Sequence, residues 1–134
     1  MEAAEKRHNA QCSNRDYDFF YEGLVDRKIL IQQCAACEKL RQPPEPMCPH
    51  CHSLEWKTKA MAGSGKIYSY VVHRHPPLPG FEMPHPVGLI ELDEGVRVVA
   101  ALDPIPIDQI KIGMPVTAEF FQRDNVAMVR FRRA

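Results

Sequence analysis

Two Cys-x-x-Cys pairs constrain this chain more than any other feature of its sequence. Cys34 and Cys37 form the first pair, and Cys48 and Cys51 form the second, ten residues further on. Two thiolates at this spacing can reach one ion from a single tight turn, and a second turn completes a tetrahedral site. The pattern predicts a zinc ribbon with one structural zinc ion. Because four protein ligands close the site, we expect it to organise structure and not to catalyse.

Other chemistries remain open for the same four cysteines. They could form two disulfides, serve as unrelated core residues, or bind iron with four thiolates. Cys12 lies outside the paired pattern, in a polar leader, and a fifth ligand would not fit a closed tetrahedral site. His50 and His52 lie in and beside the second pair, where we expect them to be exposed or to support the ligands.

Charge and hydropathy narrow the possible partners. Seventeen basic and seventeen acidic residues cancel, whereas zinc ribbons that bind nucleic acid usually carry a basic excess. Arg130, Arg132 and Arg133 are interpreted as a solvated tail or an anion contact. No apolar run is long enough to span a bilayer, and no signal peptide is visible. Thiols arranged for metal suit a reducing compartment, so the sequence predicts a cytoplasmic protein without nucleic-acid or membrane partners.

The first part of the chain predicts a short helix followed by the ribbon. Residues 1–28 comprise a polar leader and a helix whose apolar face carries Phe19, Phe20 and Leu24 at helical spacing. A helix this short is not stable alone, so that face must dock on the rest of the chain or on a partner. The ribbon is expected within residues 29–60, and its pattern ends at Trp56.

Residues 61–134 predict a small barrel. The β-prone runs are 67–73, 87–92, 96–102, 116–121 and 126–131, with one helical turn near 106–112. Five strands with a short helical turn between the third and the fourth are the element order of an OB-fold. The alternative is another small antiparallel barrel or a sandwich. The predicted fold class is mainly β with a small α component.

A proline-rich loop at 76–86 interrupts these strands and should form neither a regular helix nor a central strand. It carries three apolar side chains, Leu78, Phe81 and Met83. Apolar groups on a stiff loop lose little entropy on contact, which suits a binding surface. The alternative is that the loop folds back and caps its own barrel.

Catalytic motifs are missing from the sequence. It has no phosphate-binding loop, nucleophile elbow or His-Glu-x-x-His motif. His73, His75 and His85 flank the proline-rich loop, and with Glu82 they could perform acid–base chemistry. The favoured interpretation is that they contact a ligand or a partner.

Taken together and in order, these segments resemble the acyl-CoA-associated zinc-ribbon/OB-fold proteins, known as domain of unknown function number 35. The resemblance covers residues 16–131. The segments that carry it are Phe19-Phe20-Tyr21-Glu22-Gly23-Leu24, Leu30-Ile31-Gln32-Gln33-Cys34, Pro43-Pro44-Glu45-Pro46-Met47-Cys48-Pro49, Gly63-Ser64-Gly65-Lys66-Ile67-Tyr68-Ser69-Tyr70, the loop at 76–86, Leu89-Ile90-Glu91-Leu92-Asp93-Glu94-Gly95 and Ile112-Gly113-Met114-Pro115-Val116. One departure is Asp26-Arg27-Lys28, where relatives often carry glycine in the turn before the ribbon.

The resemblance implies an N-terminal helix, a rubredoxin-like zinc ribbon and a C-terminal five-stranded OB-fold. It also implies a non-catalytic subunit that binds acyl-CoA and completes or stabilises a thiolase or retro-aldolase in lipid or aromatic acid degradation. The catalytic partner would be a separate chain in a hetero-oligomer. The alternatives are a subunit of a MaoC-type enoyl-CoA hydratase and a free-standing nucleic-acid-binding module. An independent enzyme that uses the histidine-flanked loop is a third reading.

A CoA site needs positive charge for the phosphates and an apolar track for the pantetheine and acyl chain. The candidates for the phosphates are Lys66, Arg74, Arg97 and Arg123, and those for the track are Leu78, Phe81 and Met83. The candidate partner interface comprises Phe19, Phe20, Leu24, Leu78 and Phe81. The sequence leaves open whether the acyl group is aliphatic, aromatic or steroidal, and whether thiolysis or retro-aldol cleavage follows.

Overall fold

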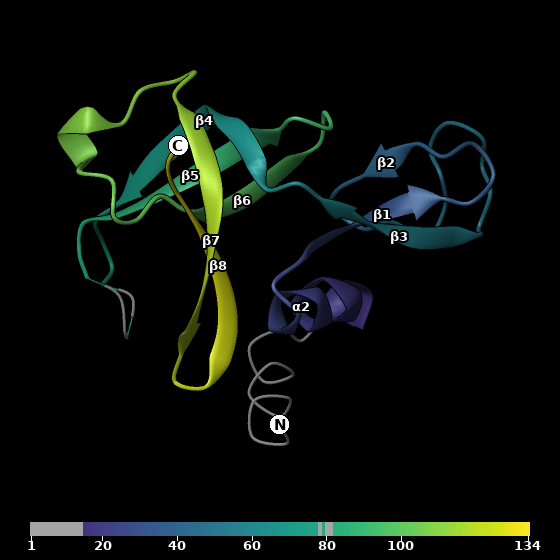
Figure 1. Cartoon of the computed structure of the whole chain (residues 1–134), viewed down its shortest axis with the longest axis horizontal. Helices are drawn as coiled ribbons and strands as arrows, with labels where there is room; N and C mark the ends of the chain where they lie inside the picture. Colours follow the sequence, from purple (N-terminus) through teal and green to yellow (C-terminus); the bar gives the residue numbers. More distant parts are fainter. Residues whose placement is uncertain (1–14, 78, 80–81) are drawn as a thin grey trace. The chain divides into compact units, whose positions relative to one another are not determined.

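The computed structural model describes residues 15–77, 79 and 82–134. The chain forms two compact units. One contains the helix and ribbon up to Ala62 together with the hairpin tip Phe120–Met128, and the other contains Gly63–Glu119 and Val129–Ala134. Figure 1 shows the elements of the ribbon in purple through blue to dark teal and the strands of the barrel in teal to yellow.

The ribbon unit consists of a short helical segment and a three-stranded sheet. Its elements are η1 (Arg15–Tyr17), α2 (Asp18–Val25), β1 (Ile29–Cys34), β2 (Leu40–Arg41) and β3 (Trp56–Met61). The strand order is β2-β1-β3, and both pairings are antiparallel. Helix α2 lies close to β1 at Gly23, where an added Cβ would lie 2.7 Å from Cγ of Leu30. Because glycine has no Cβ, the short helix can approach Leu30 of β1 this closely.

The turn between α2 and β1 is made without a glycine. Arg27 adopts a left-handed φ of 57°, and the N–H groups of Arg27 and Lys28 donate to the carbonyls of Leu24 and Gly23 at 3.0 and 2.8 Å. These hydrogen bonds use two of the carbonyls that a helix leaves unpaired at its end. The turn therefore forms with Asp26-Arg27-Lys28 and without glycine. Arg27 adopts the left-handed conformation, which is strained for a residue with a side chain.

Strand β3 extends beyond the point where the ribbon pattern was expected to end. It begins at Trp56 and pairs with β1 along its whole length, from Cys34↔Trp56 to Ile29↔Met61. Lys57, Thr58 and Lys59 show no alternation of apolar and polar residues, so the sequence carries no strand pattern there. The backbone ladder with β1 determines this strand.

The second unit is built around a closed barrel with the strand order β4-β5-β6-β8-β7. Its elements are β4 (Ser64–His73), β5 (His85–Leu92), β6 (Arg97–Ala101), η2 (Ile107–Gln109), β7 (Pro115–Arg123) and β8 (Val126–Arg133). Strands β6 and β8 run parallel and meet at Ala101 and Arg130. The fully buried side chains of the core include Ile67, Ile90 and Phe131. The predicted OB-fold, with a helical turn after the third strand, is confirmed.

Two turns of the barrel depend on left-handed residues. Gly95, at φ 95°, closes the β5–β6 hairpin by donating its N–H to the carbonyl of Leu92 at 2.8 Å. Asp124 and Asn125 both have positive φ, 51° and 65°, in the two-residue turn between β7 and β8. Such turns match the twist of the flanking strands, and Asn and Asp tolerate this conformation better than most residues.

The expectation that His85 and Pro86 belong to the loop was wrong, because β5 begins at His85 and Pro86 pairs with Val72. Proline cannot donate a hydrogen bond to the neighbouring strand. The carbonyl of Pro86 accepts the N–H of Leu102 at 3.1 Å, and the carbonyl of Leu102 accepts the N–H of Ile105 at 3.2 Å. A residue other than proline at position 86 would donate its N–H to the carbonyl of Leu102. That carbonyl is already paired with Ile105, so the proline leaves no acceptor unpaired.

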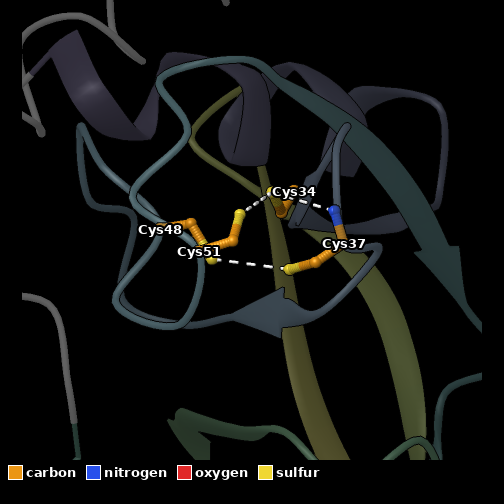
Figure 2. Close-up of side chains that lie close together, drawn as sticks. All are labelled: Cys34, Cys37, Cys48 and Cys51. Atoms are coloured by element: carbon orange, nitrogen blue, oxygen red, sulfur yellow. Dashed lines mark hydrogen bonds between the residues drawn. The ribbon is translucent and has the colours of Figure 1, made fainter.

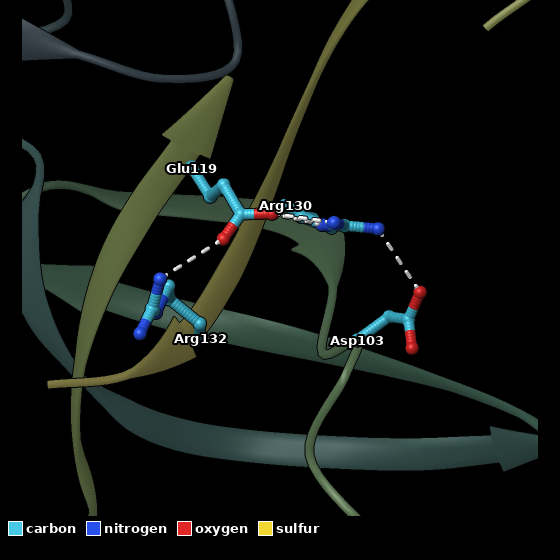
Figure 3. Close-up of polar contacts among 4 residues, drawn as sticks. All are labelled: Asp103, Glu119, Arg130 and Arg132. Atoms are coloured by element: carbon cyan, nitrogen blue, oxygen red, sulfur yellow. Dashed lines mark hydrogen bonds and ion pairs between the residues drawn. The ribbon is translucent and has the colours of Figure 1, made fainter. Parts of the chain in front are cut away.

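The C-terminal arginines are held within the second unit and do not form a free tail. Figure 3 shows Arg130 between Glu119 and Asp103, with Arg132 on the other oxygen of Glu119. The Nε atom of Arg130 donates to Glu119 at 2.8 Å, and its Nη1 donates to Asp103 at 3.2 Å. Arg133 donates to the side chain of Gln109 at 2.7 Å. These contacts connect β8 to β7, to η2 and to the segment that follows β6.

No helix in the described ranges combines the length and the hydropathy needed to cross a membrane.

Candidate metal centre and ligand-binding residues

The two cysteine pairs lie on turns of the same design. In each turn the N–H four residues after the first cysteine donates to that cysteine's carbonyl, from Glu38 to Cys34 at 3.0 Å and from His52 to Cys48 at 2.9 Å. Glu38 and His52 have positive φ angles of 66° and 64°. Each first cysteine also donates its own N–H to the carbonyl five residues on. The side chain of His52 is exposed, so its contribution is the backbone turn.

The four thiols converge on one point, as Figure 2 shows. The sulfur atoms of Cys34 and Cys51 lie 3.5 Å apart, those of Cys37 and Cys48 lie 3.6 Å apart, and all four lie within 4.8 Å of one another. Tetrahedral zinc binds sulfur at about 2.3 Å, which separates neighbouring sulfur atoms by about 3.8 Å. The donor set and its spacing therefore fit a structural zinc ion.

The protonation of these thiols is unequal without a cation among them. The backbone N–H of Cys37, which donates to Sγ of Cys34 at 3.4 Å, lowers the pKa of Cys34 to about 6. The backbone N–H of Cys51 lowers the pKa of Cys48 in the same way. The N–H of Lys39 acts to lower the pKa of Cys37, but burial and the neighbouring thiols outweigh it and raise that pKa to about 11. Cys37 can therefore ionise near neutral pH only if a cation compensates the charge of its neighbours.

A buried polar network supports the segment between the two turns. Gln32 accepts hydrogen bonds through Oε1 from Nε of Arg41 at 2.9 Å and from the N–H of Glu45 at 2.8 Å. Its Nε2 donates to the carbonyl of Glu45 at 3.0 Å, as does Nη2 of Arg41 at 3.1 Å. Both Gln32 and Arg41 are buried. Nothing in the motif spacing pointed to this network, which fixes the proline-rich connection against β1.

Two of the four basic residues predicted to meet CoA phosphates lie together. Lys66 on β4 and Arg97 on β6 both contact Glu91 on the intervening β5, at 3.8 and 3.3 Å. Arg97 also lies over the ring of Tyr68, 3.7 Å from its centroid. Tyr68 was not among the residues predicted to contact CoA, although it is 45% exposed and stands two residues from Lys66 on the same strand. Tyr68 lies at an irregularity of the β4–β5 pairing, where the register shifts between Ile67 and Ser69.

The other two basic residues lie at or just beyond the ends of strands. Arg74 follows the far end of β4, eight residues from Lys66, and Arg123 ends β7 beside the hairpin turn. Of the apolar track, Met83 is half-buried. Leu78 and Phe81 lie outside the described residues.

The predicted interface residues of α2 differ in their surroundings. Leu24 is only 4% exposed, so its side chain is already covered within the chain. Phe19 contacts the ring of Trp56 on β3, with centroids 5.2 Å apart, and Phe20 packs edge-on against Tyr17 and Tyr21. Trp56 remains 42% exposed. An exposed tryptophan in contact with the half-buried Phe19 was not expected from the sequence.

The histidines flanking the proline-rich loop lie at the shared end of β4 and β5. His73 and His85 are opposite one another in the strand register. The Nε2 atom of His73 lies 2.6 Å from the carbonyl oxygen of Pro76, so this nitrogen carries the proton and donates it. His75 and Glu82 are exposed.

A four-thiolate ribbon followed by a five-stranded OB barrel defines a class of small zinc-ribbon/OB-fold proteins. Residues 22–57 match the family described as "ChsH2, rubredoxin-like zinc ribbon domain", and residues 58–121 match "ChsH2, C-terminal OB-fold domain". The chain belongs to this ChsH2 family, whose members are also called DUF35 proteins. Its ribbon carries one structural zinc ion.

Three relatives illustrate the family. The chain is 51% identical over 111 residues, or 83% of its length, to a "Probable enoyl-CoA hydratase alpha subunit" of Thermomonospora curvata, and it spans 35% of that relative. It is 25% identical to the "Benzoylsuccinyl-CoA thiolase subunit BbsA" of Thauera aromatica, with 96% of both chains covered. A chain in the solved structure "Ltp2-ChsH2(DUF35) aldolase" is 48% identical, with 90% of this chain and 95% of that chain covered and a TM-score of 0.84.

Proposed function

We propose that this chain is the non-catalytic subunit of a thiolase-like enzyme, a thiolase or a retro-aldolase, that acts on a CoA thioester. The observation that carries this proposal is the 48% identity to the chain of the Ltp2-ChsH2(DUF35) aldolase along 95% of that chain's length. The likeness to the benzoylsuccinyl-CoA thiolase subunit, which also extends over nearly the whole of both chains, supports the same enzyme class.

In this proposal Cys34, Cys37, Cys48 and Cys51 hold the zinc ion, and the metal has a structural role. Four thiolates fill a tetrahedral site and leave no position for a substrate. The distances between their sulfur atoms support the assignment. Catalytic groups would then come from the partner subunit, and the ribbon would present a surface of fixed shape to it.

The chain would also bind acyl-CoA, with Lys66 and Arg97 as the contacts for its phosphates. Both cations share the single carboxylate of Glu91, so one positive charge is left for a ligand. The exposed ring of Tyr68, covered on one face by Arg97, offers its other face for stacking. Arg74 and Arg123 stay further candidates for the phosphates, and Leu78, Phe81 and Met83 for the apolar track.

A second candidate function is the corresponding part of an enoyl-CoA hydratase, which the 51% identity to a hydratase alpha subunit favours. The chain spans about a third of that relative, so hydration would again require groups from elsewhere. A nucleic-acid-binding role has less support, because a net charge of zero gives little attraction to a phosphate backbone.

The test is reconstitution with a catalytic subunit. The chain should co-purify with the Ltp2 subunit of the related aldolase, or with the thiolase-like chain of its own source. The complex should cleave a 3-hydroxyacyl-CoA or a 3-oxoacyl-CoA that neither subunit cleaves alone. Turnover by the isolated chain at an ordinary enzymatic rate would show that the proposal is wrong. Hydration of a 2-enoyl-CoA by a reconstituted complex would instead favour the second candidate.

Charge removal tests the CoA contacts within the same complex. Lys66→Gln and Arg97→Gln should raise the apparent KM for the CoA thioester, because each removes a cation from the proposed phosphate site. Lys111→Gln, on an exposed residue after η2, is the matched control and should leave KM unchanged.

A further inference from the structure

Strand β3 is an edge strand, and the side of its backbone that faces away from β1 is open. The order β2-β1-β3 leaves β3 with one neighbour. The N–H of Ala35 donates to the carbonyl of Glu55 at 3.0 Å, so these two residues form a hydrogen-bonded pair of the antiparallel ladder. Every second residue of β3 then bonds to β1. The backbone N–H and C=O groups of Lys57 and Lys59 point toward β1, whereas those of Trp56, Thr58 and Ala60 point outward, away from β1.

The outward groups of these three residues have no backbone or side-chain partner in the part of the chain that the structure describes. The side chains from Trp56 to Ala60 are all exposed, on both faces of the strand. Outward-pointing residues recur about every 6.7 Å along a strand, which is the spacing of the complementary groups on any extended chain. The edge therefore has the geometry for strand addition, in which main-chain hydrogen bonds give affinity.

The side chains specify which strand would fit. Trp56, Thr58 and Ala60 share one face of β3, and Lys57 and Lys59 share the other. A strand added at this edge would place alternate side chains beside the two lysines and the others beside Trp56. Opposite charges across neighbouring strands stabilise a pair, and like charges destabilise it.

We propose that the open edge of β3 accepts an extended segment of the catalytic subunit in which acidic and apolar side chains alternate. The acidic side chains lie beside Lys57 and Lys59, and the apolar ones lie beside Trp56. This inference rests on the proposed function, because it requires a partner subunit.

Charge argues against a second copy of this chain as the occupant. An antiparallel pair of β3 strands centred on Thr58 would put Lys57 of each copy opposite Lys59 of the other. Lys57 lies 3.7 Å from Glu38 of its own chain, an exposed pair that gives weak compensation, and no carboxylate in the described residues lies within ion-pair distance of Lys59. Two lysines on one face of an open edge instead select an acidic strand.

Thr58→Pro tests the edge directly. It removes only an outward N–H, so the ladder to β1 keeps all its donors, and proline is tolerated at such edge positions. Binding to the Ltp2 subunit, measured by calorimetry on the full zinc-loaded chain, should weaken about tenfold to a hundredfold. Thr58→Val keeps the N–H and is the matched control. Lys59→Glu, which leaves every backbone bond in place, should weaken binding to an acidic strand by about twofold to thirtyfold.

Amide hydrogen exchange gives a second readout. In the free chain the amides of Thr58 and Ala60 should exchange fast and those of Lys57 and Lys59 slowly. In the complex with Ltp2 all four should be slow. If the wild-type chain binds Ltp2 while Thr58→Pro and Lys59→Glu bind equally well, the edge is not the contact and this inference alone fails. If the wild-type chain binds no catalytic subunit, the proposed function fails with it.

Two other results would also overturn the inference. Slow exchange at Thr58 and Ala60 in the free chain that disappears when residues 1–14 are removed would make the chain's own leader the occupant. Slow exchange that appears only as the protein concentration rises would make it a second copy.

Discussion

Strands β1 and β5 are both central strands, yet different forces hold them. Residues of β5 alternate regularly between half-buried and buried, and the inward set, which includes Ile90 and Leu92, joins a core around Phe131. Strand β1 lies between a two-residue strand and a strand that is exposed at five of six positions, and it ends at Cys34. The barrel depends on an apolar core, whereas the ribbon depends on a metal ion and a buried polar network.

Removing zinc should produce the largest difference between the two regions. Structural zinc contributes about 10–16 kcal/mol to the folding of small zinc modules, more than so small an apolar cluster supplies. A strong chelator, or Cys34→Ser or Cys48→Ser, should therefore abolish amide protection in β1 while β5 stays protected. Metal analysis should find one zinc ion per chain before treatment. Protection of β1 that persists without metal, or iron in stoichiometric amount, would contradict the comparison.

Phe131→Ala should destabilise the barrel and leave the zinc ribbon unaffected. Phe131 is 0% exposed in the barrel core, and truncating a fully buried phenylalanine typically costs about 3–5 kcal/mol. Thermal unfolding should show a destabilised barrel, while zinc content stays at one ion per chain. Ile112→Ala, at a position that is 70% exposed, is the control and should change stability by about 0.5 kcal/mol or less. Loss of zinc from Phe131→Ala would mean that the two regions do not fold independently.

Gln32→Ala should test the polar network of the ribbon. It would leave Nε of Arg41 and the N–H of Glu45 without the acceptor they share, at a cost of about 1–3 kcal/mol. The effect should appear as faster zinc release to a chelator. Gln33→Ala is a matched control one residue along, because Gln33 makes only an exposed hydrogen bond to the carbonyl of Glu38. Equal release rates for the two variants would assign ribbon stability to the metal alone.

The smallest effect should come from Glu119 in the barrel. The hydrogen bond from Arg130, aided by the charges of Arg130 and Arg132, lowers the pKa of this carboxyl. A group whose pKa is lower in the folded state adds stability above its unfolded pKa, about 4.3 for glutamate, and loses that contribution as the pH falls through the folded pKa. Glu119→Gln should therefore lower the melting temperature slightly at pH 7, and the difference from wild type should vanish in acid. A difference that persists at low pH would point to lost packing instead of lost charge.

The elements that could be predicted from the sequence are those with a local chemical cause. Cysteine spacing predicted the metal site, and five β-prone runs with one helical turn between the third and the fourth predicted the barrel. The contact of Arg97 with Tyr68 joins β6 to β4, and β3 depends on its ladder to β1, so neither leaves a periodic pattern in the sequence. The burial of Leu24 depends on how closely α2 packs on β1 at Gly23. In each case the cause is a residue distant in sequence.

The two lysines of β3 also have a consequence for the chain before it meets any partner. An uncovered strand edge is a template on which identical chains can stack into fibrils, and charged side chains on such an edge oppose stacking. Any chain synthesised in excess of its partner would depend on Lys57 and Lys59 to stay monomeric. Replacing both lysines with threonine would keep the strand and remove this protection, so the variant should aggregate on storage while its zinc site remains intact.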